Sequence, residues 1–219
     1  MVKMMAGNAE LLTPSEAAVV ASVSVRDVNR VIDESILPDE FIRVGDGRHV
    51  VVAGCSLIAF YFESANRLTS EQRLWAIKAA GPRLKRSLPA ATLLKEDWTL
   101  RDDFLTIDLA PFLRKTWERL GRLEEARTMV VTSSEVLGGT PVIRGTRVPV
   151  YDVAASTAAG IPVDRILTAY PSLDADKVEL AAIYAEANPP RGRPRHIPEL
   201  PPGATIITDR RVSRRRKAE

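Results

Sequence analysis

The stretch from residue 138 to residue 187 constrains this chain more than any other, because glycine and proline divide it at short intervals. It opens with Gly-Gly-Thr-Pro-Val-Ile-Arg-Gly-Thr-Arg-Val-Pro-Val, and the apolar residues on both sides of Gly145 predict a short hairpin that turns there. Three helical patterns follow. The first ends at Gly160, because glycine often follows the end of a helix. The second starts after Pro162, because proline suits the first turn of a helix, and the third starts after Asp174, which can cap the helix N-terminus. Three helices with tight turns predict a helix-turn-helix module.

These residues resemble the domain-of-unknown-function family 433, small helix-turn-helix domains found in VapB-like antitoxins. The resemblance covers about residues 136–188 and also includes the motifs A-G-I-P and I-L-x-x-Y-P-x-L and an alanine-rich last helix. It implies an antitoxin that binds DNA near its own promoter and neutralises a PIN-like ribonuclease toxin. Arg144, Gly145 and Arg147 lie on the motif. The two arginines either contact DNA or a partner, or brace the hairpin through carboxylates such as Asp152.

The last helix of this module suits DNA poorly, because Asp174, Asp176 and Glu179 near its start would repel phosphates. Helix capping explains the aspartates without a ligand. Apolar residues lie on two sides of this helix, which predicts two neighbours and favours a dimer or a toxin interface.

The N-terminal part predicts a second DNA-binding unit. Capping boxes start a helix at residue 14 and another at Val25, which runs to about Ser35 with Val25, Val28 and Ile32 on one face, and a hairpin turns at residues 45–47. This order resembles the winged-helix domains of MerR and excisionase proteins. The expected DNA-binding residues are Arg26, Asn29 and Arg30, for base edges, and Arg43 and Arg48 on the wing, for phosphates. An ordinary solvated helix face is the alternative.

Between the two modules, the patterns predict helices at 54–62 and 69–80, with Gly81-Pro82 as a stop. Residues 83–98 are expected to be a loop with one strand near 91–94. A strand at 104–108, a helix at 110–126 and a strand at 129–131 predict a connector whose two strands pair with each other, either within one chain or across a dimer.

The basic charge is concentrated at the C-terminal end. Residues 188–219 hold nine Lys and Arg and three Asp and Glu, a net charge of +6, whereas residues 1–187 have a net charge of −3. The proline-rich segment 189–219 predicts an extended tail. Its guanidinium groups match the metal-binding carboxylates of a PIN-like nuclease, although DNA binding or an inert tail are alternatives. The expected toxin-binding residues are Ile206, Ile207, Arg210, Arg211, Arg214, Arg215 and Arg216.

The fold class is therefore predicted to be mainly α with short β elements, in which two helix-turn-helix modules are joined by a small strand-helix-strand segment. The expected domains are 1–82, a winged helix; 83–135, the connector; 136–188, the antitoxin module; and 189–219, the tail. The predicted function is that of a type II antitoxin which represses its own operon, with a PIN-like ribonuclease toxin, operator DNA and a second copy as partners. The alternative is a stand-alone transcription regulator without a toxin.

Composition argues against several other classes. The single Cys55 excludes an internal disulfide and suits a reducing cytoplasm, and one cysteine with two distant histidines predicts neither a metal nor a cofactor site. No apolar run is long enough to span a membrane, and residues 1–10 lack the apolar core of a signal peptide. Known catalytic motifs are absent, so we do not expect an enzyme.

Overall fold

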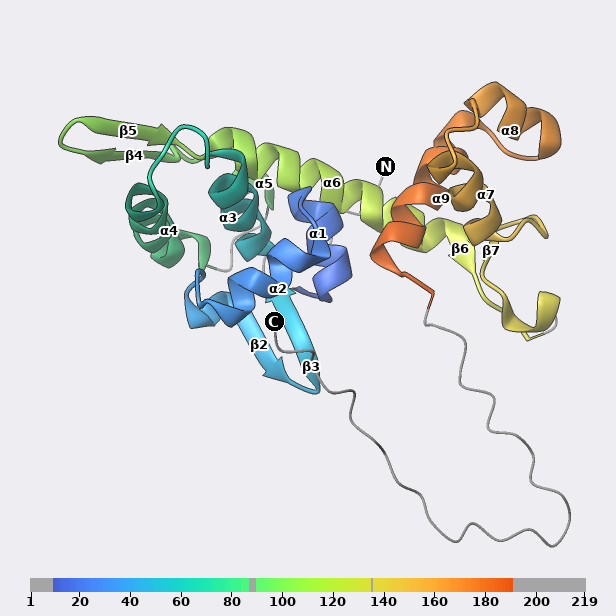
Figure 1. The fold of residues 1–219 in the computed structure, drawn as a ribbon, viewed down its shortest axis with the longest axis horizontal. Helices are drawn as coiled ribbons and strands as arrows, with labels where there is room; N and C mark the ends of the chain where they lie inside the picture. The colour runs from blue at the N-terminus through green and yellow to red at the C-terminus, as the bar shows by residue number, and fades with distance from the viewer. Residues whose placement is uncertain (1–9, 87–89, 135, 191–219) are drawn as a thin grey trace, which may run out of the picture. The chain divides into compact units, whose positions relative to one another are not determined.

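A computed structural model of the chain describes residues 10–86, 90–134 and 136–190, and the fold is mainly helical with short strands, as the sequence predicted (Figure 1). The chain divides into two units after Pro189, so that nearly all of the described residues belong to the first unit. Among the described residues, no helix has both the length and the apolar character needed to cross a membrane.

The N-terminal helices begin where their capping boxes predict. Thr13 caps α1 (Pro14–Ala21) and Ser24 caps α2 (Val25–Asp33), each in a reciprocal bond with the acidic residue three positions on. The residues that α2 buries differ from those predicted. Val28 and Val31 are fully buried, whereas Val25 is 38% exposed. Because Val25 is the first helical residue, it lies at the open end of the buried stripe.

A three-stranded sheet lies beside these helices, in the order β1-β3-β2. The hairpin of β2 (Ile42–Gly45) and β3 (Gly47–Val51) was predicted, and Gly47 has the positive φ of +127° that its turn requires. The third strand, β1 (Leu11–Leu12), was not predicted. It pairs antiparallel with the end of β3, and a two-residue strand is too short for a recognisable alternation. A 3₁₀ helix, η1 (Asp39–Phe41), precedes β2.

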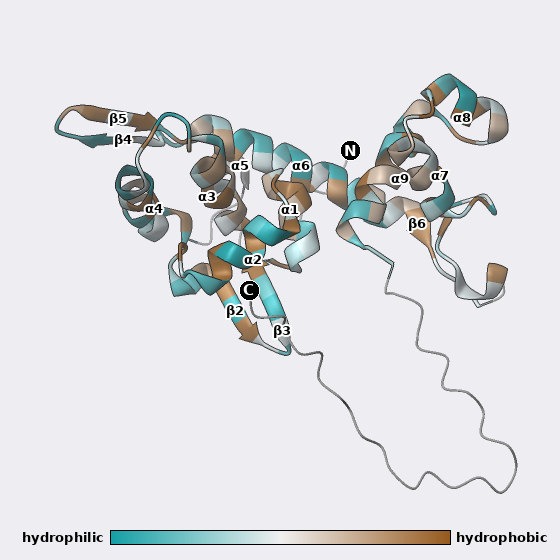
Figure 2. Ribbon diagram, in the orientation of Figure 1, coloured by the Kyte–Doolittle hydropathy of each residue, from teal (hydrophilic) through white to brown (hydrophobic). Residues whose placement is uncertain are grey.

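The helix α3 (Val52–Glu63) is buried on nearly all sides, because η1, α1, α4 and α6 all pack against it. In Figure 2, α3 is mostly brown to pale, whereas α2 carries both teal and brown residues. Gly54 permits this packing. A Cβ atom there would lie 3.0 Å from the Cβ of Phe41 and 3.3 Å from the Cδ1 of Leu37, which is closer than ordinary contact.

The helix α4 (Ser70–Leu84) corrects one expectation, since it does not stop at Gly81-Pro82. The amide of Lys85 donates to the carbonyl of Gly81 at 2.9 Å, and Leu84 is fully buried. A Cβ at Gly81 would lie 3.5 Å from the Pro38 ring and 3.7 Å from the Cε2 of Phe41, which are ordinary van der Waals distances, so this turn packs against the core. Burial of the last turn therefore outweighs the hydrogen bond that Pro82 cannot make.

The region predicted as a loop with a strand near 91–94 instead contains a short helix, α5 (Ala90–Leu93). Leu93 and the following Trp98 are buried, so the segment belongs to the main core. That core runs from Leu12 to Leu123 and includes Ala187.

The predicted pairing of the two connector strands is wrong. Strand β5 (Leu105–Asp108) pairs with β4 (Thr99–Asp102), and β6 (Val130–Val131) pairs with β7 (Val142–Ile143). Between β5 and β6 lies α6 (Ala110–Met129), a helix of 20 residues. At 1.5 Å per residue it is about 30 Å long, so its two flanking strands stand at opposite ends.

The C-terminal helices follow the prediction closely. They are α7 (Val150–Ala158), α8 (Val163–Ala169) and α9 (Ala175–Ala187), with a 3₁₀ helix, η2 (Leu137–Gly139), before β7. Gly145 has a φ of +76°, as its turn requires, and Val142 bridges to Pro149. A second, smaller core contains Ile143, Val150, Val153, Ile166, Leu173, Val178 and Ala181.

Both apolar sides of α9 are covered by the chain itself. Val178 and Ala181 face the smaller core, while Ile183 and Ala187 pack against the main core. The helix contacts α7 and α8, and also α1 and α6. The inference of a dimer or toxin interface from this two-sided pattern therefore loses its basis, because both neighbours are intramolecular.

Candidate nucleic-acid interface

Arg48 on the wing strand β3 reaches the exposed face of α2 through its side chain. Arg48 donates from Nη1 to the Oδ1 of Asn29 at 3.4 Å and forms an ion pair of 2.8 Å with the Oδ1 of Asp33. Asn29 also donates from Nδ2 to the carbonyl of Val25 at 3.0 Å. The fold thus joins one expected base-reading residue to one expected wing residue that is nineteen positions away in the sequence.

The two arginines of α2 differ in their surroundings. Arg26 is exposed and forms no hydrogen bond or ion pair within the described part of the chain. Arg30 forms an ion pair with Glu34, with Nε and Oε1 3.0 Å apart, and both side chains are about half exposed. Such an exposed pair costs little to break, so both guanidinium groups are available to phosphates or base edges.

Arg43 is directed elsewhere. Its Nη1 donates to the carbonyls of Asp39, Glu40 and Ile42 at 3.3, 3.1 and 2.8 Å. Its hydrogen-bond partners therefore lie on η1 and β2 rather than on α2, and the structure does not bring it into the group formed by Asn29 and Arg48.

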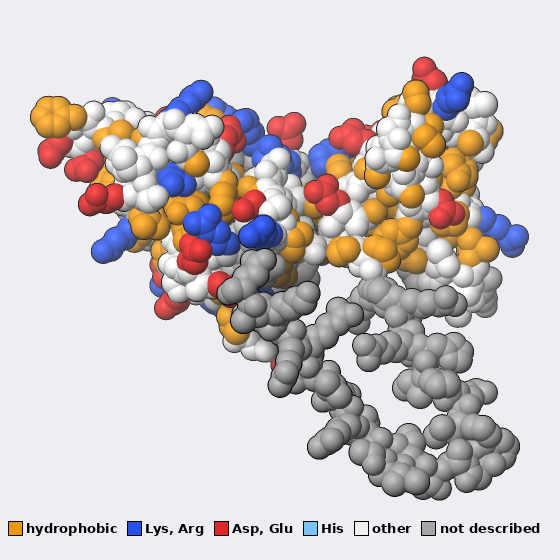
Figure 3. Space-filling model, viewed as in Figure 1, with side chains coloured by type: hydrophobic (Ala, Val, Ile, Leu, Met, Phe, Trp, Pro, Cys, Tyr) orange, Lys and Arg blue, Asp and Glu red, His pale blue; other side chains and the backbone are white. Residues whose placement is uncertain are grey.

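Two acidic residues belong to this surface, Asp33 at the end of α2 and Glu34 at its C-terminal cap. The helical pattern places Asp33 on the exposed face, whereas Glu34 was missed. The four-residue spacing of Arg30 and Glu34 is a helical ion-pair signal that reveals one of them. The pairing of Asp33 with Arg48 depends on the fold and has no local signal. Figure 3 likewise shows basic and acidic side chains interspersed on the face in view, in keeping with the small net charge of the folded part.

In the second module, Arg144 braces the fold, which was one of the two alternatives. Its Nε and Nη2 donate to the carbonyl of Thr128 at 3.0 and 2.7 Å. The partner is thus a carbonyl in the last turn of α6, where a cation is favourable, and not Asp152. Arg147 is exposed and has no polar partner among the residues that the structure describes.

The acidic start of α9 is also engaged within the chain. The Oδ1 of Asp174 accepts from the amide of Lys177 at 2.8 Å, and this bond lowers the pKa of Asp174. Arg122 of α6 binds Asp176 at 2.7 Å and Glu179 at 3.1 Å. The capping explanation for Asp174 is confirmed, and the other two carboxylates neutralise Arg122.

The expected toxin-binding residues, Ile206 to Arg216, lie outside the described residues. Within the described ranges, histidine, cysteine, aspartate and glutamate do not gather into a group that could hold a metal ion.

Comparison with known proteins supports the sequence resemblance and extends its start. Residues 130–185 match the family described as "Protein of unknown function (DUF433)". The match includes β6, which is consistent with the pairing of β6 and β7. The chain is also 64% identical over 211 residues to the uncharacterised protein y4eO of Sinorhizobium fredii (strain NBRC 101917 / NGR234). The alignment covers 95% of this chain and 96% of that protein.

This chain belongs to the y4eO family. The near-complete coverage means that the family shares the N-terminal region, the 130–185 match and most of the remaining sequence. No solved structure matches the chain.

Proposed function

We propose that this member of the y4eO family is an antitoxin that binds its operator through α2 and the β2–β3 wing and neutralises a PIN-like ribonuclease. The observation that carries the DNA-binding part is the contact of Arg48 with Asn29 and Asp33, which places wing and helix on one surface. The toxin partner rests on the resemblance of residues 136–188 to modules of VapB-like antitoxins.

The arrangement suits recognition of a duplex. A helix that enters the major groove presents its arginine and asparagine side chains to base edges, while a neighbouring wing contacts phosphates. Arg26, Asn29 and Arg30 lie on the part of α2 that the core leaves free, because Val28 and Val31 face inward. The acidic Asp33 and Glu34 weaken the attraction to phosphates, so affinity depends on how these ion pairs rearrange.

Alanine at Arg26 or Asn29 is expected to weaken binding to DNA from upstream of the gene by about 10-fold or more, because a lost bidentate base contact costs about 1–3 kcal/mol. The reverse change is a matched test. Glu34→Gln removes an acidic group from the same surface and should strengthen binding. Gel shifts of purified full-length variants at one fixed salt concentration measure both effects.

Lys78→Ala provides the control, since this exposed lysine lies on α4, which packs mainly against α3 and β4. Equal affinities for the wild-type chain, Arg26→Ala and Glu34→Gln would rule out this surface as the DNA contact.

Substitution of the tail tests the toxin-binding part. Glutamine at Arg210, Arg211, Arg214, Arg215 and Arg216 is expected to lower affinity for the ribonuclease encoded beside this gene by about 100-fold, because charge-assisted guanidinium–carboxylate pairs are lost. Calorimetric titration with the purified partner measures the affinity, and a ribonuclease assay measures inhibition.

The operator gel shift serves as the control for folding of this variant. If the five-glutamine variant inhibits the ribonuclease as well as the unchanged chain does, the tail is not the inhibitory segment. If the neighbouring gene product does not bind at all, the stand-alone regulator becomes the better description.

A further inference from the structure

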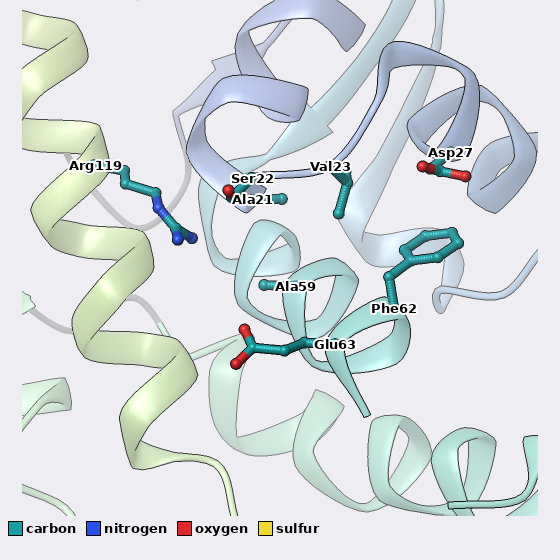
Figure 4. Close-up of a pocket in the computed structure, with 8 residues that line it drawn as sticks. All are labelled: Ala21, Ser22, Val23, Asp27, Ala59, Phe62, Glu63 and Arg119. Atoms are coloured by element: carbon teal, nitrogen blue, oxygen red, sulfur yellow. The ribbon is translucent and has the colours of Figure 1, made fainter. Parts of the chain in front are cut away.

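A pocket lies between the turn that joins α1 to α2, the helix α3 and the helix α6 (Figure 4). Its apolar lining comes from Ala21, Val23, Ala59 and Phe62, and its volume is about 320 Å³. A cavity of about 150 Å³ already holds benzene, and small-molecule sites begin at about 300 Å³. The pocket is therefore large enough for a ligand of about the size of an amino acid.

Three ionisable side chains share this lining, namely Asp27 on α2, Glu63 on α3 and Arg119 on α6. Arg119 is half-buried, yet it forms no hydrogen bond or ion pair with the residues that the structure describes, including the two carboxylates. A guanidinium group in this position has lost part of its hydration without a compensating contact. A ligand that brings a carboxylate to Arg119 would supply that contact in a charge-assisted pair.

Each of the two carboxylates is engaged through only one of its oxygen atoms. The Oδ2 of Asp27 accepts the hydroxyl and the amide of Ser24 at 2.7 and 3.3 Å. The Oε1 of Glu63 pairs with the Nζ of Lys115 at 3.1 Å, and both of these side chains are about half exposed, so the pair costs little to rearrange. Within the described part of the chain, the other oxygen of each carboxylate has no hydrogen-bond donor, so each can accept one from a ligand.

The arrangement of these groups indicates the charge pattern of a ligand. Figure 4 shows Arg119 and Asp27 on opposite sides of Val23, with Glu63 below them and the ring of Phe62 on the same side as Asp27. Two carboxylates and one guanidinium group match a ligand that has two positive charges and one negative charge. The apolar lining between them suits a chain of methylene groups, and the face of Phe62 adds a favourable contact for a cation.

We propose that this pocket binds a basic α-amino acid of the lysine or arginine type. The carboxylate of the ligand pairs with Arg119, its α-ammonium group with Glu63 and its side-chain cation with Asp27. Its methylene groups pack on Val23 and Ala59. The proposal goes beyond the proposed function and is independent of it, because binding of the amino acid is measured without DNA or a toxin.

Titration of the isotope-labelled full chain with L-lysine, followed by NMR at constant ionic strength, tests this site. The amide signals of Val23 and Ala59 are expected to shift saturably, with a Kd of about 1 mM or tighter. Cadaverine lacks the carboxylate of lysine, ε-aminocaproate lacks the α-ammonium group and norleucine lacks the side-chain cation. Each should bind about 10-fold or more weakly than lysine, because one charge-assisted contact is lost. The absence of a saturable shift up to about 50 mM lysine, or norleucine binding as tight as that of lysine, would overturn the proposal.

The variant Arg119→Gln tests the assigned contact with the carboxylate. It should weaken the binding of lysine by about 10-fold but should not weaken that of cadaverine, which has no carboxylate. Arg114→Gln is the matched control, since this exposed arginine of α6 does not line the pocket, and it should leave the affinity for lysine unchanged. The NMR spectrum of each variant reports directly whether the fold is kept. An affinity for lysine in Arg119→Gln equal to that of the wild type, or an equal loss of cadaverine binding, would contradict the assignment.

Discussion

Replacing Trp98 with alanine is expected to lower the free energy of unfolding by about 3–5 kcal/mol, the usual cost of removing a large buried aromatic side chain. Trp98 is 1% exposed, and its Nε1 donates to the carbonyl of Leu93 at 2.7 Å. The guanidinium carbon of Arg83 lies 4.4 Å from the centre of the Trp98 ring. The backbone carbonyl of Trp98 accepts a hydrogen bond from the amide of Leu109 at 3.1 Å. One side chain and its backbone therefore connect α4, α5 and the start of α6.

Two further variants separate the contributions of the indole hydrogen bond and of side-chain burial to this loss of stability. Trp98→Phe keeps much of the apolar area but leaves the Leu93 carbonyl without its donor, so we expect a smaller loss of about 1–3 kcal/mol. Trp75→Ala removes a tryptophan that is only partly buried on α4, and it should cost less than Trp98→Ala. Urea unfolding followed by circular dichroism measures all three, and equal losses for Trp75→Ala and Trp98→Ala would contradict this account.

Replacing Arg127 with methionine is expected to lower the free energy of unfolding by about 2–3 kcal/mol near neutral pH. Arg127 lies near the end of α6 and is 27% exposed. Its guanidinium group binds Glu10 at 2.8 Å and Glu16 at 2.7 Å, and it also contacts Glu124. Without it, three carboxylates face one another with no cation between them, and the link from α6 to α1 is lost.

The loss should depend on pH in a defined direction. Burial by itself raises the pKa of Glu16, but the hydrogen bond from Arg127, together with those from Thr13, outweighs burial and holds the pKa below its ordinary value of 4.5. A carboxylate whose pKa is lowered by folding stabilises the fold above its unfolded pKa, and this contribution disappears as the pH falls through the folded value. The difference between wild type and Arg127→Met should therefore be largest near pH 7 and shrink below pH 4.5.

Arg30→Met provides the matched control for this prediction. Its pair with Glu34 is of similar length, at 3.0 Å, but both side chains are about half exposed, so the expected loss is at most about 0.5 kcal/mol. Urea unfolding at several pH values measures both variants. A loss in Arg127→Met that is no larger than that in Arg30→Met, or one that grows as the pH falls, would show that the cluster does not act as described.

The starts of α1, α2, α4 and α9 could be predicted because their signals are local, whereas α5 was not predicted. The boxes at Thr13, Ser24 and Thr69 and the cap at Asp174 each satisfy backbone amides within three residues, so no other part of the chain is needed to form them. The same holds for the Gly47 and Gly145 turns, since only the backbone conformation decides them.

The sequence predicted which residues make up the candidate site, but not which of them contact one another. The pattern of α2 indicates which side chains stay outside, yet the sequence has no signal that Arg48 meets Asn29 and Asp33 or that Arg43 folds back onto η1. The contacts of Arg48 join residues that are far apart in the sequence and that only the tertiary fold brings together, whereas the partners of Arg43 are near in the sequence but depend on the bend between η1 and β2.

By itself, the sequence predicted where α1, α2, α4 and α9 begin, where the chain turns at residues 45–47 and Gly145, and a recognisable module at about residues 136–188, which the family match at 130–185 supports. The tertiary structure decided that α4 continues through Pro82, that β5 pairs with β4 and not with β6, and that both sides of α9 are covered within the chain. The reason is physical. Caps and turns are settled by the free energies of a few neighbouring residues, whereas strand pairing and helix length here depend on apolar surface buried against distant parts of the chain.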